Sequence, residues 1–115
     1  MRKYRNVKGL GKLGYLTGGE RLWLRRRRRG QSQPEAARAA GIKTGTYKKF
    51  ERDAAAGPLV VIHEIEPGER AAVHRRRSGL TQQAVARRLG VSRIWVNRME
   101  RGLEKADKLL SFWEK

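Results

Sequence analysis

The side chains that most often carry out chemistry in proteins are scarce in this chain. It has no cysteine and only two histidines, His63 and His74. Neither histidine has a carboxylate or a second histidine at a metal-ligand spacing, and no nucleophile stands in a recognisable arrangement with a base. The lack of cysteine excludes disulfides and thiolate metal sites. We therefore expect no enzyme activity, no catalytic residue, no metal site and no cofactor.

Positive charge is the chemical property that the sequence offers instead. Of the 115 residues, 28 are Lys or Arg and 11 are Asp or Glu, which gives a formal net charge of +17. The excess occurs in residues 1–14, in residues 15–63 and in residues 64–115. Because it is spread along the whole chain, it favours a polyanionic partner that contacts several parts of the molecule.

The length allows one domain or two very small ones. No apolar run approaches the length of a membrane span, and the N-terminus lacks the apolar core of a signal peptide. We expect a cytoplasmic protein without membrane contact.

Residues 1–16 are basic, rich in glycine and free of acidic residues, which predicts a flexible basic arm. Phosphate or minor-groove contact is its functional interpretation, and a solubilising tail is the alternative. Gly9 to Gly14 matches the G-x-G-x-x-G pattern. A dinucleotide site also needs a preceding strand and a surrounding βαβ unit, and neither is visible, so nucleotide binding is disfavoured.

Residues 81–102 have the pattern of two short helices joined by a tight turn. Thr81 and Ser92 are placed to cap the two helices, and Gly90 ends the first one because glycine tolerates positive φ. Apolar residues recur at helical spacing on the sides that must face each other, namely Val85, Ala86, Leu89, Val96 and Met99. The opposite side of the second helix is left for solvent or a ligand, and it carries Arg93, Ile94, Asn97 and Arg98.

The same pattern occurs twice in the chain. With an offset of 49 residues, residues 19–53 align with residues 68–102 without a gap, and thirteen of the 35 pairs are identical. Six of these are arginine pairs, which an arginine-rich chain produces easily. The other seven fall at caps, turns and close contacts: Gly19/Gly68, Glu20/Glu69, Gly30/Gly79, Gln33/Gln82, Ala37/Ala86, Gly41/Gly90 and Glu51/Glu100. A repeat of this kind determines the architecture.

Capping signals predict the remaining helices. Capping boxes are formed by Thr17 with Glu20 and by Ser32 with Glu35. Together with a proline at position 67, they place helices at about 17–29, 32–40, 43–52 and 66–78, and a last one from Asp107. Leu22, Trp23 and Phe50 are expected core residues. The run from Leu59 to Ile62 favours a short fourth helix, with a strand as the alternative because of its β-branched residues.

The two-helix pattern resembles the helix-turn-helix of the phage repressor and Cro family. Counting Gln82 as the first position, that family has a small residue fifth, a glycine ninth and a branched aliphatic residue fifteenth. Ala86, Gly90 and Val96 match, and the ending from Met99 to Gly102 is also similar. In the first copy the corresponding residues are Ala37, Gly41 and Tyr47, and the tyrosine departs from the family pattern.

The resemblance implies an all-α fold of two tandem helix-turn-helix bundles, which the absence of a flexible linker predicts to pack as one pseudo-symmetric body. The first repeat would cover residues 17–65 and the second residues 66–115. It also implies a regulator of transcription that binds double-stranded DNA near the nucleoid, encoded by a phage or another mobile element. The last helix has a large apolar surface that either closes its own repeat or forms a homodimer contact, through Leu109, Leu110, Phe112 and Trp113.

In that family the exposed face of the second helix and its N-terminus read base edges. Carried over by position, the implied base-reading residues are Thr44, Gly45, Lys48, Lys49, Arg93, Ile94, Asn97 and Arg98. Arg93 could bind guanine bidentately, Asn97 could read adenine, and Ile94 could contact a thymine methyl. The implied backbone contacts are Arg26, Arg27, Gln33, Lys43, Arg75, Arg76, Gln82, Ser92 and Trp95. The two glutamines resemble family positions that either contact phosphates or brace the recognition helix.

Three other functions agree with the same residues. An antitoxin-like protein would bind both DNA and a protein partner, and the apolar C-terminal helix would suit it. A non-specific architectural protein would use the arginine excess, and an RNA-binding protein would prefer folded RNA to duplex DNA.

Overall fold

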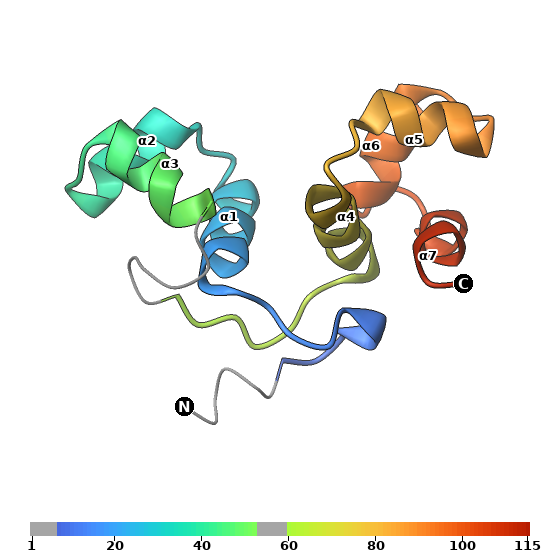
Figure 1. Cartoon of the computed structure of the whole chain (residues 1–115), viewed down its shortest axis with the longest axis horizontal. Coiled ribbons are helices and arrows are strands. Elements are labelled where there is room, and N and C mark those ends of the chain that lie inside the picture. The colour runs from blue at the N-terminus through green and yellow to red at the C-terminus, as the bar shows by residue number, and fades with distance from the viewer. Residues whose placement is uncertain (1–6, 53–59) are drawn as a thin grey trace. The chain divides into compact units, whose positions relative to one another are not determined.

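A computed structural model describes residues 7–52 and 60–115, which form two compact helical units. The first unit contains α1 (Gly18–Arg29), α2 (Gln33–Ala40) and α3 (Thr44–Arg52) (Figure 1). The second contains the 3₁₀ helix η2 (Gly11–Leu13), α4 (Pro67–Ser78), α5 (Gln82–Leu89), α6 (Arg93–Glu100) and α7 (Asp107–Trp113). The described residues contain no strand, only an isolated bridge between Lys8 and Glu64. The expected all-α fold with two helical bundles is confirmed.

The helix ends follow from local capping chemistry. The hydroxyls of Thr17 and Ser32 accept hydrogen bonds from the backbone N–H groups three residues later, and the carboxylates of Glu20 and Glu35 accept from the capping residues in return. These reciprocal bonds satisfy backbone donors that the first helical turn leaves without a partner. Four helices end at a glycine with positive φ, namely Gly30, Gly41, Gly79 and Gly90.

The core of the second unit is aliphatic. Helix α4 packs against α6 and α7, and α5 packs against α6. The shared cluster consists of Ala71, Val85, Ala86, Val96, Met99 and Leu109, all at most 2 % exposed. Leu110, Phe112 and Trp113 pack against this cluster and are half-buried. Helix α7 therefore closes its own repeat, and Leu109, which is fully buried, is not available for a homodimer contact.

The core of the first unit is built differently. Helix α3 packs against α1 and α2, and Tyr47 occupies the position of Val96 with only 1 % of its surface exposed. Leu24 is buried, whereas Trp23, which we expected in the core, is half-buried with the Arg27 guanidinium 5.0 Å above its ring. Phe50 is also only half-buried. The phenol ring of Tyr47 is larger than the side chain of its counterpart Val96. It therefore occupies core volume that is then not available to Trp23 and Phe50.

The segment that joins the repeats is not the helix that we predicted. Val60 and Ile62 are buried and Val61 is exposed, which is the alternation of an extended chain. β-branched side chains favour this backbone because they are restricted at χ1. Leu59 lies outside the described residues.

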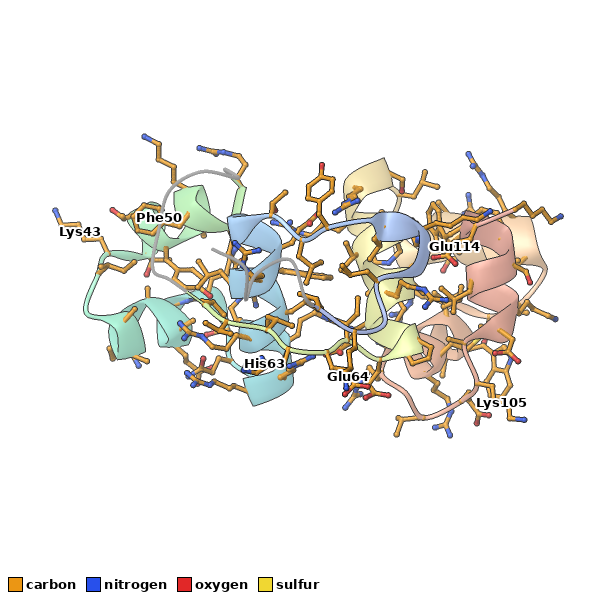
Figure 2. All side chains as sticks on the ribbon, turned by 90° about the horizontal axis from the view of Figure 1, so that it is seen from below. Lys43, Phe50, His63, Glu64, Lys105 and Glu114 are labelled. Atoms are coloured by element: carbon orange, nitrogen blue, oxygen red, sulfur yellow. The ribbon has the colours of Figure 1, made fainter. Side chains whose placement is uncertain are left out.

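The described part of the N-terminal arm is packed, in contrast to the expected flexible arm. Val7 and Leu13 are buried, the Lys8 N–H donates to the His63 carbonyl, and the Ile65 N–H donates to the Lys8 carbonyl, both at 2.9 Å. Figure 2 shows Glu114 beside this segment, where its backbone carbonyl accepts a hydrogen bond of 2.7 Å from Lys12 Nζ. Apolar residues at every third position, from Val7 to Leu13, pack this segment against the second unit. The prediction of a flexible arm gave more weight to the glycines than to these residues. Residues 1–6 lie outside the described residues.

Candidate nucleic-acid interface

Helix α6 has one anchored face and one free face. Ser92 caps it, with its Oγ accepting from the Trp95 N–H at 3.1 Å, and Val96 and Met99 are buried in the core. Its free face holds Arg93, Ile94 and Arg98, and Ile94 is 64 % exposed. Trp95 is partly exposed and Asn97 is half-buried. The structure therefore brings the implied base-reading residues of the second copy onto one short helix.

Helix α3 has the same orientation within the first unit. Tyr47 and Glu51 are buried, and the other side carries Gly45, Lys48 and Lys49 in exposed positions, with Thr44 half-buried. A Cβ atom added at Gly45 would meet no atom within 4 Å, so the backbone there is openly accessible. Lys43 precedes the helix and extends away from the unit (Figure 2).

A buried network holds α6 from behind. The carboxylate of Glu100, which is fully buried, accepts hydrogen bonds from Arg75 Nε at 2.7 Å and from Arg75 Nη2 at 3.0 Å. Gln82 Nε2 donates to the same carboxylate at 3.0 Å, and Arg75 Nη1 donates to the Leu80 carbonyl at 3.2 Å. Because these residues belong to α4, α5 and α6, a single carboxylate ties the three helices together. Such charge-assisted bidentate bonds are the strong ones among protein hydrogen bonds.

The first unit repeats this network at the equivalent residues. Glu51 accepts from Arg26 Nε at 2.6 Å, from Arg26 Nη2 at 3.2 Å and from Gln33 Nε2 at 3.1 Å. Arg26 Nη1 donates to the Gln31 carbonyl at 3.2 Å, which corresponds to the bond to Leu80 in the second unit. The offset of 49 residues relates each of these four residues to its counterpart in the other network.

This network changes the role that four residues have in the structure. Arg26 and Arg75 are half-buried and donate to buried carboxylates, which leaves fewer of their N–H groups for the phosphate contact that the resemblance implies. Gln33 and Gln82 make the bracing contact, which was one of the two roles that the resemblance implied. The buried carboxylates themselves were missed as functional residues. Their signal was the identical pair Glu51/Glu100 on an otherwise apolar helix face.

The other implied backbone contacts differ in their exposure. Ser92 and Lys43 are exposed at the two helix starts, and Arg76 is half-buried on α4. Arg27 is engaged with the Trp23 ring. These residues and Trp95 stay candidates for contact with a nucleic-acid backbone.

A glycine lets α4 approach α6 closely. A Cβ atom added at Gly68 would collide with the carbonyl of Met99 and would lie 2.8 Å from that of Glu100. Only glycine avoids this clash at position 68. The approach positions the end of α6 directly over the first turn of α4.

Tyr47 adds a polar group to the network of the first unit. Burial, followed by a hydrogen bond to the Glu51 carboxylate, raises the pKa of the Tyr47 phenol from 10.0 to about 12. Val96, the aligned residue of the second unit, has no hydroxyl group. The first unit therefore fills its core with a side chain that also touches the buried carboxylate.

The described residues provide neither a cluster of metal ligands nor a membrane-spanning helix. No group of three or more His, Asp or Glu side chains in residues 7–52 and 60–115 is placed to hold a metal ion. Within the same residues no helix combines the length and apolarity that crossing a membrane requires.

Comparison with known families agrees with this geometry. Residues 67–108 match a family model described as a helix-turn-helix domain. The match covers α4, α5, α6 and the start of α7, and it does not extend to the first unit. Searches of curated proteins and of solved structures found no match to the chain. The second unit thus contains a helix-turn-helix domain, a class of domain whose presence indicates DNA binding.

Proposed function

We propose that the chain is a sequence-specific regulator of transcription that binds duplex DNA through tandem helix-turn-helix motifs. The observation that carries this proposal is the arrangement of α6. Its buried side is fixed by Val96, Met99 and the Glu100 network, and its exposed side presents Arg93, Ile94 and Arg98. A rigid helix with a bidentate donor and an aliphatic contact on its free face can distinguish base pairs in the major groove.

The first unit is proposed as a second reader. Its network and helix order support this, because Lys48 and Lys49 occupy the places of Asn97 and Arg98 on an equally anchored helix. The exposed residues of the two helices differ, so a single chain would read two unlike half-sites. If the two repeats pack like a repressor dimer, these half-sites should lie about one helical turn apart, and footprinting measures that spacing.

Dimerisation through α7 receives little support. Leu109 is fully buried, and Leu110, Phe112 and Trp113 pack against the core of their own unit. We propose that the chain acts without a homodimer contact at this helix. An origin in a phage or another mobile element rests on the resemblance to the repressor and Cro family alone.

The salt dependence of binding tests the proposal. If about six phosphates are neutralised, the logarithm of the association constant should fall with the logarithm of salt concentration at a slope of about −5. The measurement is fluorescence anisotropy with labelled duplexes at several salt concentrations. A slope near zero would exclude DNA as the partner.

The same assay separates the alternatives. A target sequence recovered by genome-wide footprinting should bind at least tens-fold tighter than an unrelated duplex of equal length. Equal affinity for both would favour the non-specific architectural function. Tighter binding to folded RNA than to either duplex would favour the RNA-binding alternative.

A further inference from the structure

The first unit contains a small hollow among its three helices. It has a volume of about 170 Å³ and lies between α1, α2 and α3. Its lining combines arginine side chains with a floor of small apolar groups and the buried phenol: Arg25, Arg26, Arg29, Gln31, Ala36, Ala39, Ala40 and Tyr47.

The sequence of α2 explains why this space is open. The 49-residue offset aligns Ala36 and Ala40 with Val85 and Leu89, and it aligns Gln31 with Leu80. In the second unit these larger aliphatic side chains pack against the hydrophobic cluster. Alanine side chains end at Cβ, so in the first unit the equivalent volume is not filled.

The charge around the hollow is not balanced. Arg26 is engaged with Glu51, but Arg25 and Arg29 have no ion pair with any residue in the ranges 7–52 and 60–115. They are four residues apart on α1, so their side chains lie on the same side of the helix and their charges repel. None of the described residues that line the hollow is acidic. Arg25 and Arg29 therefore line a concave site to which no acidic side chain of the described residues contributes.

The second unit supplies an anion of its own at the equivalent place. His74 aligns with Arg25, and its Nε2 lies 2.8 Å from the Glu114 carboxylate, which is also 3.0 Å from Arg70 Nε. The Trp113 ring stacks on His74 with 6.0 Å between the ring centroids. At the end of α7, Trp113 thus covers the His74 ring and Glu114 contributes a carboxylate beside it. In the first unit, the described residues that align with α7 are 60–64, and they form no helix.

We propose that the hollow of the first unit binds a phosphate group. Guanidinium groups recognise such oxyanions through paired N–H donors, and arginine is the residue best suited to this task. Pockets for drug-sized ligands occupy about 300–1,000 Å³, so a hollow of about 170 Å³ suits a single phosphate group better than a whole nucleotide. The bound group would relieve the repulsion between Arg25 and Arg29 and would link α1 to α2.

The test is a titration of the full chain with inorganic phosphate, followed by NMR at constant ionic strength with chloride as the reference anion. We expect saturable shifts at the backbone amides of Gln31, Ala36, Ala39 and Ala40. The double variant Arg25→Gln/Arg29→Gln should weaken this binding at least ten-fold. The matched control is Arg87→Gln/Arg88→Gln, which removes two exposed arginines from α5 and should leave the binding unchanged.

A second variant keeps the charges and removes the space. Ala40→Leu introduces the residue found at position 89 and should abolish the phosphate shifts while Arg25 and Arg29 remain. Shifts that do not saturate, or that persist equally in both the arginine variant and Ala40→Leu, would overturn the proposal. They would show the general attraction of anions to a chain of charge +17.

DNA binding by the same variants identifies the source of the phosphate group. If Arg25→Gln/Arg29→Gln lowers DNA affinity and flattens its salt slope while free phosphate competes with DNA, the group belongs to a nucleic-acid backbone. If DNA affinity is unchanged while free phosphate still binds the parent chain, the site takes a free ligand. Failure of DNA binding altogether would refute the proposed function and leave the phosphate titration as an independent result.

Discussion

The two units share one frame and fill it differently. In each, an arginine of the first helix and a glutamine of the second helix donate to a buried carboxylate at the end of the third, with donor–acceptor distances between 2.6 and 3.2 Å. Around this frame, the second unit packs Val96, Leu89 and the helix α7, whereas the first has Tyr47 and alanines. The frame therefore sets the direction of the third helix, and the filling is free to vary.

This difference also separates orientation from stability. Hydrogen bonds are directional and allow few geometries. The same network can therefore fix the orientation of α3 and of α6 relative to the neighbouring helices, although the two cores differ. Apolar side chains in a core interact without directional preference, and they stabilise the fold in proportion to the apolar area that they bury. We expect the second unit, with its larger aliphatic core and α7, to be the more stable of the two.

The largest effect should come from removing a buried carboxylate. Glu100→Ala leaves the half-buried Arg75 and Gln82 without their acceptor, and loss of one partner of a buried pair costs about 3–5 kcal/mol. Hydrogen exchange should therefore show faster opening of α4 to α6, with the first unit little changed. Glu51→Ala should have the reverse pattern.

Glu104→Ala is the matched control for this prediction. Glu104 pairs with Arg98 at 3.1 Å, but the Arg98 side chain is 44 % exposed, and an exposed pair contributes only about 0–1 kcal/mol. Equal protection in Glu100→Ala and Glu104→Ala would show that the frame does not stabilise the unit.

Footprinting compares the two proposed readers directly. Lys48→Ala with Lys49→Ala, and separately Arg93→Ala with Arg98→Ala, should each remove protection from a different half of the target site. A good bidentate base contact is worth about 1–3 kcal/mol, so Arg93 should give the larger loss of sequence preference. Arg76→Ala, a candidate backbone contact, should instead weaken all sequences alike. Full protection by the Lys48/Lys49 variant at unchanged affinity would mean that the first unit is a scaffold.

Filling the hollow should make the first unit more like the second. Ala40→Leu adds apolar volume at the position of Leu89, and cavity filling commonly stabilises by about 0.5–2 kcal/mol. Thermal unfolding should show a higher melting temperature for α1 to α3, and Ala40→Ser should not. A lower melting temperature for the leucine variant would indicate that the hollow has no room for the side chain.

The smallest effect concerns alkaline pH. The folded-state pKa of Tyr47 is raised above its ordinary value, so the unfolded chain loses this proton first as pH rises. The contribution of the phenol to stability is present below about pH 10 and is lost as pH approaches 12. The free energy of unfolding of the first unit should thus fall over this range, and Tyr47→Phe should flatten the fall. A slope unaffected by the substitution would assign the pH dependence to other groups.

The sequence alone was sufficient to predict the ends and the buried faces of α5 and α6. Capping residues, glycines with positive φ and apolar spacing act over a few residues, so the bounds of α5 and α6 could be read directly from the chain. The exposed positions of Arg93, Ile94 and Lys48 followed from the same helical period. At these residues the tertiary contacts agree with the local signals and do not override them.

Tertiary structure decided which polar residues are free. Arg26 and Arg75 look like their arginine neighbours in the sequence, but each meets a carboxylate 25 residues away once three helices have packed. The anchoring of residues 7–14, the extended course of residues 60–62 and the burial of Leu109 were decided in the same way. In each case the partner is distant along the chain. For a polar group, burial determines whether it pairs with that partner or stays in water, because an unpaired buried polar group is costly.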